Sequence, residues 1–334
     1  MRQPEVARLT ALALALLVVA PVVCAARTAL LAGAFLVDFL TRGRPAVLSA
    51  LTHPPVRRPL PLPGAQADLY LHAGLEAGRA MVLVHGFAPE GKDDPRVQSV
   101  AALLARAGFD VAVPTIPGLT AGRLGAEDVE PVVGALAARA EKAVVVGVSV
   151  GAGPALLAAA DPRGHDRAGI VLSLGGYSSA AEVLRFWLTG AYAYDGVRGR
   201  VDHDPALVRM FVRANADRLD AASRAVLEAG DRDAAARFLD APPPDFKRYL
   251  DTLSPLRVAS AIGARLILVH GRGDPAVPYT ESLRLAAARP ERTTLVLVGV
   301  VGHVEAADSS GRQAVRDLFA LWRVMYTVMR AGGA

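Results

Sequence analysis

Cysteine is nearly absent from this 334-residue chain, and the single Cys24 excludes both an intramolecular disulfide framework and a cysteine-rich zinc site. Charged residues are also scarce, at 21% against 52% hydrophobic residues, and this balance excludes a mainly disordered protein. The mean hydropathy of +0.32 is high for a wholly soluble chain. A membrane segment is therefore the first feature to look for.

The long C-terminal part of the chain lacks an excess of charge of either sign. Residues 1–64 hold seven arginines and two acidic residues, which account for the whole net charge of +5. Residues 65–334 hold 30 basic and 30 acidic residues and are neutral. A nucleic-acid-binding domain carries a basic stripe or patch, so we expect no nucleic-acid partner.

An apolar region lies near the N-terminus. Residues 9–26 carry no charge, and a second apolar run, residues 28–37, follows Arg27. A helix that spans a bilayer needs about 20 mostly apolar residues. We favour a permanent membrane anchor over a cleaved signal peptide, although Arg2 and Arg8 before the run also suit a signal peptide. A helix buried against the domain is least favoured, because the run has no polar face.

The arginines around this region bear on its orientation. Four follow it and two precede it, and excess positive charge stays on the cytoplasmic side. A single span or a two-span hairpin would then keep the body inside the cell, whereas cleavage of a signal peptide would export it. We expect residues 1–44 to form the anchor or signal segment and the proline-rich residues 45–64 to form a stiff connector. Residues 65–334 are the predicted folded domain.

The folded domain alternates short apolar strands with helices. Continuous apolar strands of this kind predict an α/β fold with a mostly parallel, doubly wound sheet that is covered on both faces. The alternation stops between residues 176 and 256, where we expect a helical cap insertion above the C-terminal ends of the strands. The predicted strands are residues 80–84, 109–113, 143–148, 169–174, 266–269 and 293–298. The predicted helices are residues 95–107, 126–140, 153–160, 278–288 and 312–329.

A G-x-S-x-G pattern at residues 147–151 follows a predicted strand and precedes a predicted helix. In such an elbow the glycines, here Gly147 and Gly151, permit a sharp and strained turn that lifts the serine above the sheet. Ser149 is therefore the candidate nucleophile. The alternative is an ordinary glycine-rich turn, so the pattern needs support from elsewhere in the chain.

That support comes from two later strand ends. A serine hydroxyl is a poor nucleophile without a base, and the base needs an acid to orient it. Asp274 follows the predicted strand 266–269, and His303 follows the predicted strand 293–298. The order Ser149, Asp274, His303 predicts a catalytic triad of the α/β-hydrolase type.

His85, Gly86 and Phe87 follow the predicted strand 80–84. With this segment the sequence resembles the α/β-hydrolase superfamily over roughly residues 66–330. The resemblance implies an oxyanion loop here, with the backbone N–H groups of Phe87 and Val150 as donors to the developing oxyanion. We expect His85 to brace the loop, because His303 already takes the role of the base.

Serine at the elbow narrows the chemistry. In the resembled superfamily, dehalogenases and epoxide hydrolases have aspartate there, and dienelactone hydrolases have cysteine. We expect a membrane-associated serine hydrolase of the esterase or lipase type, which acts on a small acyl substrate through an acyl-enzyme with no metal or other cofactor. An amidase or peptidase with the same triad, and a non-catalytic membrane-attached binding protein, remain as alternatives.

Two other segments each allow two interpretations. The charge-dense residues 89–96 either contact substrate or, as we prefer, form a solvated turn before a helix. Arg185, Phe186 and Trp187 in the insertion either line an acyl pocket or, as is commoner for aromatic residues, belong to the core of the insertion.

Overall fold

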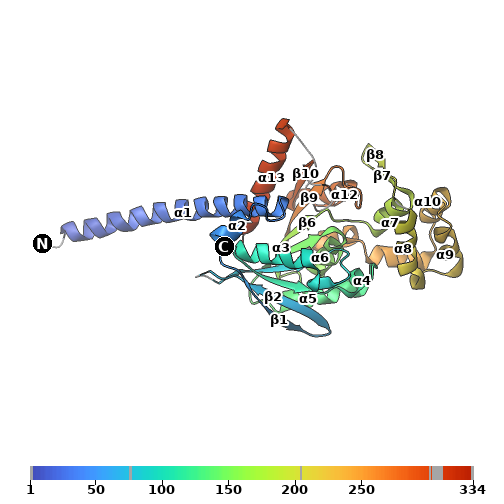
Figure 1. Cartoon of the computed structure of the whole chain (residues 1–334), viewed down its shortest axis with the longest axis horizontal. Helices are drawn as coiled ribbons and strands as arrows, with labels where there is room; N and C mark the ends of the chain where they lie inside the picture. Colours follow the sequence, from blue (N-terminus) through green and yellow to red (C-terminus); the bar gives the residue numbers. More distant parts are fainter. Residues whose placement is uncertain (1–2, 75–76, 204, 301, 303–310, 332–334) are drawn as a thin grey trace.

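The computed structural model describes residues 3–74, 77–203, 205–300, 302 and 311–331 (Figure 1). An eight-stranded sheet in the order β1-β2-β4-β3-β5-β6-β9-β10 forms the centre of the body. Its six strands from β4 to β10 run parallel, and the β1–β2 and β2–β4 pairs are antiparallel. The strands are β1 Val56–Leu62, β2 Ala65–Leu71, β3 Arg79–Val84, β4 Phe109–Pro114, β5 Ala143–Val148, β6 Ala168–Leu174, β9 Arg265–Gly271 and β10 Thr293–Val298.

Helices cover both faces of this sheet, as the strand pattern predicts. Successive residues of β3 belong to opposite cores: Val82 packs in one and Met81 in the other. The first core lies under α5, α6 and α12, and the second lies under α3 and α13. These helices are α3 Pro95–Arg106, α5 Val129–Ala137, α6 Ala152–Ala160, α12 Thr280–Ala288 and α13 Gly311–Arg330.

Helix α3 illustrates how local sequence sets an element. Pro95 occupies its first turn, where the missing N–H costs nothing, and the carboxylate of Asp94 accepts a hydrogen bond of 2.9 Å from Arg96 N. The predicted helix 126–140 is shorter in the structure. A 3₁₀ turn, η2 Ala126–Asp128, precedes α5, which ends at Ala137.

The apolar N-terminal region forms one continuous helix, α1 Gln3–Leu40, so the two-span hairpin is excluded. Figure 1 shows the N-terminal part of α1 projecting from the body as a rod, on the side opposite the cap. The C-terminal part packs into the second core, where Ala32, Ala34 and Phe35 are buried. Trp322 of α13 also donates a hydrogen bond of 3.0 Å to Ala29 O.

Residues 45–64 differ from the predicted free-standing connector. They contain a short helix, α2 Val47–Leu51, and strand β1, which pairs with β2 over seven residues. Proline cannot donate to a ladder, but an edge strand tolerates it, and Pro59 and Pro61 lie in the edge strand β1. The folded body therefore includes residues before Gly64, and this prediction of where the domain begins is wrong.

The cap follows β6, as predicted, but it is not wholly helical. A two-stranded hairpin of β7 and β8 interrupts the helices, and Asp195 and Gly196 form its turn with φ values of 47° and 78°. This Asp-Gly pair is a hairpin signal that the helical prediction missed. The cap elements are α7 Ala180–Thr189, β7 Ala191–Tyr194, β8 Val197–Arg200, α8 Pro205–Ala214, α9 Ala221–Glu228, α10 Arg232–Asp240 and α11 Pro244–Thr252.

Candidate active site

Ser149 lies at a strained turn between β5 and α6. Its φ of 54° falls in the left-handed region, which a residue with a side chain rarely adopts. A Cβ on Gly147 would lie 2.5 Å from Ala152 Cα, and a Cβ on Gly151 would lie 2.2 Å from His85 O. Neither position has space for a side chain, which explains the two glycines of the elbow.

The loop after β3 lies directly against the serine. A Cβ on Gly86 would lie 3.0 Å from Ser149 Cβ and 3.5 Å from Ser149 Oγ. Phe87, which follows, has 37% of its surface exposed, whereas Val150 is buried beside the serine in the 3₁₀ turn η3 Ser149–Gly151, just before α6. The fold thus brings the two backbone segments that carry the predicted oxyanion donors to the same turn as Ser149.

His85 braces this loop. Its Nε2 accepts a hydrogen bond of 3.0 Å from Ile116 N, so Nδ1 carries the proton and donates to Gly86 O at 2.7 Å. The side chain is buried, and burial lowers the pKa of the imidazole below its usual value. A neutral histidine with both ring nitrogens occupied fixes Gly86 in place, as we expected.

Asp274 lies just beyond β9 and its side chain is fully buried. Oδ1 of its carboxylate accepts hydrogen bonds from Ala276 N at 2.8 Å and Val277 N at 2.9 Å. These backbone donors hold the carboxylate in one orientation and stabilise its charged form. The arrangement suits an acid that orients a catalytic base.

His270, which the sequence analysis did not single out, stands beside Asp274. Its Nε2 lies 3.4 Å from Asp274 Oδ2 and 2.9 Å from Val277 O, and its Nδ1 lies 2.8 Å from Ser282 Oγ. Because a carbonyl oxygen only accepts, Nε2 carries the proton, and Nδ1 accepts from the serine. The sequence signal for the contact between His270 and Asp274 was the position of His270 at the end of the strand, four residues before Asp274.

The predicted base, His303, lies outside the described residues. The loop that leads to it begins after β10, where Gly299 N donates a hydrogen bond of 2.6 Å to Asp317 Oδ2 of α13. Among the described residues, no group of three or more histidine, cysteine, aspartate or glutamate side chains is gathered to hold a metal ion.

Family comparisons agree with this fold. The sequence profile described as "Alpha/beta hydrolase family" matches residues 81–317, which is more than two thirds of the chain. The chain belongs to the alpha/beta hydrolase family. No curated protein matches this hydrolase.

Solved structures share its fold at low identity. A puromycin-hydrolyzing peptidase of Mycobacterium tuberculosis is 19% identical, with a TM-score of 0.51 over 82% of this chain and 39% of the peptidase. An acylaminoacyl peptidase of Pyrococcus horikoshii is 15% identical, with a TM-score of 0.55 over 86% and 43%. A 2,6-dihydroxy-pseudo-oxynicotine hydrolase is 20% identical, with a TM-score of 0.51 over 84% and 69%. The chain therefore spans about two fifths of either peptidase.

Trp187 of the cap connects three parts of this hydrolase. Its ring centroid lies 6.0 Å from that of Phe87, and its Nε1 donates a hydrogen bond of 2.7 Å to Ala276 O in the Asp274 loop. It also lines an apolar cavity between the cap helices and the loop that follows helix α4 Pro117–Thr120. The lining residues are Leu124, Ala180, Leu184, Trp187, Val212, Asn215, Leu219, Leu227, Phe246, Tyr249, Leu250 and Leu253.

Polar groups contribute little to the cavity wall. The hydroxyl of Tyr249 donates to Leu124 O at 2.6 Å, and the amide of Asn215 donates to Gly122 O at 3.5 Å. The two aromatic residues Phe186 and Trp187 have different roles, since Phe186 is fully buried in the cap and Trp187 faces the cavity.

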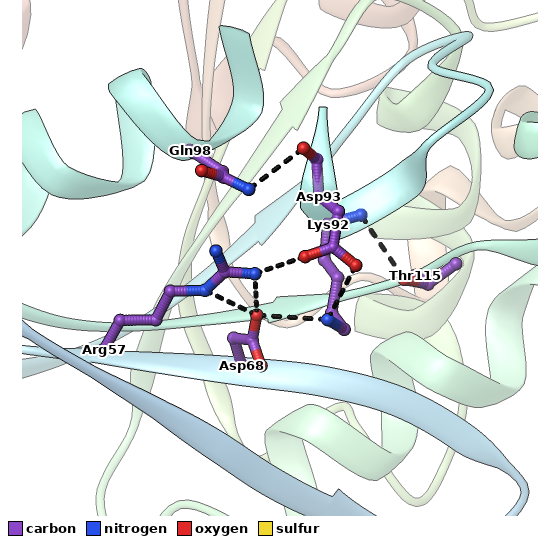
Figure 2. A network of polar contacts seen from close by, with 6 residues as sticks. All are labelled: Arg57, Asp68, Lys92, Asp93, Gln98 and Thr115. Atoms are coloured by element: carbon purple, nitrogen blue, oxygen red, sulfur yellow. Dashed lines mark hydrogen bonds and ion pairs between the residues drawn. The ribbon is translucent and has the colours of Figure 1, made fainter. Parts of the chain in front are cut away.

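The charge-dense residues 89–96 form a structural network. Figure 2 shows Asp68 of β2 accepting from both Arg57 and Lys92, while Asp93 pairs with the same two cations. Lys92 N also donates to Thr115 Oγ1 at 3.3 Å. These contacts fasten the segment after Phe87 to the edge of the sheet, which a merely solvated turn would not do.

Proposed function

We propose that this chain is a serine hydrolase that cleaves carboxylic esters with Ser149, His303 and Asp274 as its triad. Ser149 Oγ attacks the carbonyl carbon as its proton passes to His303, and the same proton then goes to the departing alcohol. Water, which loses a proton to His303, attacks the resulting acyl-enzyme. The released acid leaves Ser149 with its proton restored.

One observation carries this proposal: Ser149 has a φ of 54° at the end of β5, with Gly86 against it. Strain of this kind persists only where the surroundings impose it, and it concentrates at functional turns. The buried, backbone-bonded carboxylate of Asp274 supports the same assignment. The N–H groups of Phe87 and Val150 are the proposed donors to the oxyanion.

The proposed substrate has an apolar acyl or alcohol group. Trp187 connects the oxyanion loop to a cavity with an almost wholly apolar wall. Such a wall favours a hydrocarbon group, because it offers few partners to a polar one. The carbonyl would lie at Ser149 and the apolar group under the cap.

Labelling with a fluorophosphonate probe tests the nucleophile. The folded wild-type protein is expected to react covalently and to lose its esterase activity, whereas Ser149→Ala takes up no probe. Ser173→Ala serves as a control, because Ser173 is a buried serine of the neighbouring strand β6. Equal labelling of Ser149→Ala and the wild type would refute the assignment.

A peptidase or amidase is the second candidate, because two structures with TM-scores above 0.5 are peptidases. The triad chemistry is the same for both bond types, so the leaving group has to decide. A panel of p-nitrophenyl esters and aminoacyl anilides that share acyl groups makes the comparison. We expect a higher kcat/KM for the esters, and preference for the anilides would support the peptidase.

We also propose that α1 anchors the hydrolase in a membrane. Residues 22–40 have a mean hydropathy of 1.8 and are long and apolar enough to cross a bilayer. Because Ala32, Ala34 and Phe35 are buried against the body, we assign the proposed span to the part of α1 nearer the N-terminus, the charge-free residues 9–26. Carbonate should leave the full chain in the membrane pellet and release a chain that begins at Thr28.

A further inference from the structure

Helix α13 has an exposed apolar strip. Val315 and Phe319 are 67% and 58% exposed, and Leu318 beside them is 41% exposed. Trp322 and Tyr326 extend this face, since positions 315, 319, 322 and 326 lie on one side of a helix, but these two side chains are half-buried against the second core. Phe319 stacks on Trp322 at 5.5 Å between ring centroids, and Trp322 stacks on Tyr326 at 5.4 Å.

The opposite face of α13 is already occupied. It is buried in the second core through Leu321, Val324, Met325 and Val328. The exposed strip is therefore additional to the apolar surface that folding requires. Large apolar groups that are exposed side by side on a helix mark a surface that binds a protein or a membrane.

A row of arginines runs along the strip. Arg312, Arg316, Arg323 and Arg330 are exposed and follow at intervals of four, seven and seven residues, which places them on one side of the helix. Within the described part of the chain, none of the four has an acidic ion-pair partner. A helix with aromatic residues on one strip and arginines beside it is typical of binding at an anionic membrane surface.

The strip also lies at the level where α1 would leave the bilayer. Trp322 bonds to Ala29 O, and the charge-free run of α1 ends at Ala26. Three residues of helix correspond to about 4.5 Å. Tryptophan and tyrosine concentrate at this depth, at the boundary between acyl chains and headgroups. Figure 1 shows α13 crossing α1 rather than extending it.

We propose that α13 lies in the surface of the bilayer that α1 spans. Val315, Leu318 and Phe319 enter the acyl region, and the row of arginines contacts lipid phosphates. This proposal rests on the proposed anchoring by α1, since the anchor sets the depth of α13. Two contacts with one bilayer would fix the orientation of the body, which a single helix would leave free to turn.

Spin labels on single cysteines test the proposal in the full chain. Cys24 is the only native cysteine, so Cys24→Ser allows one label at a time. The test site is Phe319→Cys, and Glu228→Cys on the exposed end of α9 in the cap is the matched control in water. The label on native Cys24 reports on α1 itself. Vesicles of phosphatidylcholine, with or without phosphatidylglycerol, receive the protein.

Collisions with oxygen, which concentrates in lipid, and with a water-soluble nickel chelate report the depth of each label. We expect the label at 319 to collide with oxygen several-fold more than the label at 228, and to do so more strongly with phosphatidylglycerol. Arg316→Glu combined with Arg323→Glu should abolish the effect of phosphatidylglycerol.

Three outcomes would overturn the proposal in distinguishable ways. A label at 319 open to nickel, with Cys24 in lipid, refutes the contact by α13 and leaves the anchor intact. A Cys24 label open to nickel refutes the anchor and, with it, the depth assigned to α13. A label at 319 shielded from both reagents indicates that protein, such as a second copy of the chain, covers the strip.

Discussion

Gly86 keeps open the space beside the hydroxyl of Ser149. A Cβ there would lie 3.0 Å from Ser149 Cβ and 3.1 Å from Val148 O, so Gly86→Ala has to displace the loop after β3 or the serine. We expect kcat for esters to fall about 10²-fold, which is the usual effect of losing one oxyanion donor. Steady-state kinetics with a p-nitrophenyl ester measure this change.

Gly134→Ala is the matched control for that variant. Gly134 lies within α5, and no described atom comes within 4 Å of its added Cβ. Alanine in a helix is more stable than glycine by up to about 1 kcal/mol, so this variant should keep its kcat and melt no lower. An equal loss of activity in both variants would contradict the role of Gly86.

Trp187 should control which apolar groups the hydrolase accepts. Trp187→Ala removes one of the large side chains that line the cavity and the contact with Phe87, so KM should rise for long acyl esters and change little for acetate. We expect a change of about tenfold in the ratio of the two kcat/KM values, because one methylene contributes roughly 1–3 kcal/mol. Trp322→Phe on α13 is the control, and it should leave the ratio unchanged.

Asp128 predicts a pH dependence of stability. Its carboxylate accepts from Gly118 N at 2.8 Å and Gly125 N at 2.9 Å, but burial raises its pKa to about 6. A carboxyl whose pKa is raised by folding stabilises the protein most when protonated, so this contribution is lost as pH rises from about 4 to 6. A shift of about two pKa units corresponds to roughly 3 kcal/mol.

The comparison with Asp128→Asn isolates this effect from other carboxylates. Chemical denaturation at several pH values should show the stability difference between wild type and variant shrinking or reversing across that window. A difference that stays constant between pH 4 and 6 would mean that Asp128 titrates normally in the fold.

At the scale of elements, Glu281 fastens the cap to the core. Glu281 of α12 is buried, and its Oε2 accepts hydrogen bonds from Ser178 N, Ser178 Oγ and Ser179 N at 2.7–3.0 Å. Ser179 is also the N-cap of α7, where the cap begins. Glu281→Gln weakens these bonds and should destabilise the protein by about 1–3 kcal/mol.

Hydrogen exchange locates that loss. The amides of Ser178 and Ser179 should exchange faster in Glu281→Gln than in the wild type. Glu182→Gln is the control. Glu182, like Glu281, pairs with Arg284, but the side chain of Glu182 is partly exposed. A uniform increase in exchange over the whole sheet would instead indicate global destabilisation.

Elements with strong local signals could be predicted from the sequence. Asp94 and Pro95 mark the start of α3, and the apolar residues of β5 and β9 mark buried parallel strands. Strand β1 could not be predicted in this way, because its prolines argue against a strand and only pairing with β2 stabilises it. The Asp195-Gly196 turn was a usable signal that the aromatic, helix-like surroundings obscured.

In the candidate site too, local features could be predicted from the sequence and contacts between distant segments could not. The glycine spacing around Ser149 and the order of the later residues were visible in the sequence, since a motif is local. The hydrogen bonds from Ile116 N to His85 and from Gly299 N to Asp317 join segments that are distant in the sequence. No spacing of residues predicts such contacts. The hydropathy of residues 28–37 also suits a membrane segment, although part of this run packs against α13 in the second core.

At the scale of the whole molecule, the folded body should tolerate loss of the residues before Thr28, which precede the packed part of α1. It should not tolerate loss of all residues before Gly64. A chain that begins at Thr28 keeps Ala32, Phe35 and β1, whereas a chain that begins at Gly64 loses all three. The first should be soluble with the wild-type kcat, and the second should aggregate or melt at a lower temperature. Thermal melts and size-exclusion chromatography separate the two outcomes, and equal stability would contradict the assigned body.

The cap and the projecting part of α1 lie at opposite ends of the molecule (Figure 1). If α1 spans a bilayer, as we propose, the cap lies on the side of the body that faces away from this bilayer. Under this proposal, dissolved esters would reach the cap more readily than lipid esters of the membrane that holds α1.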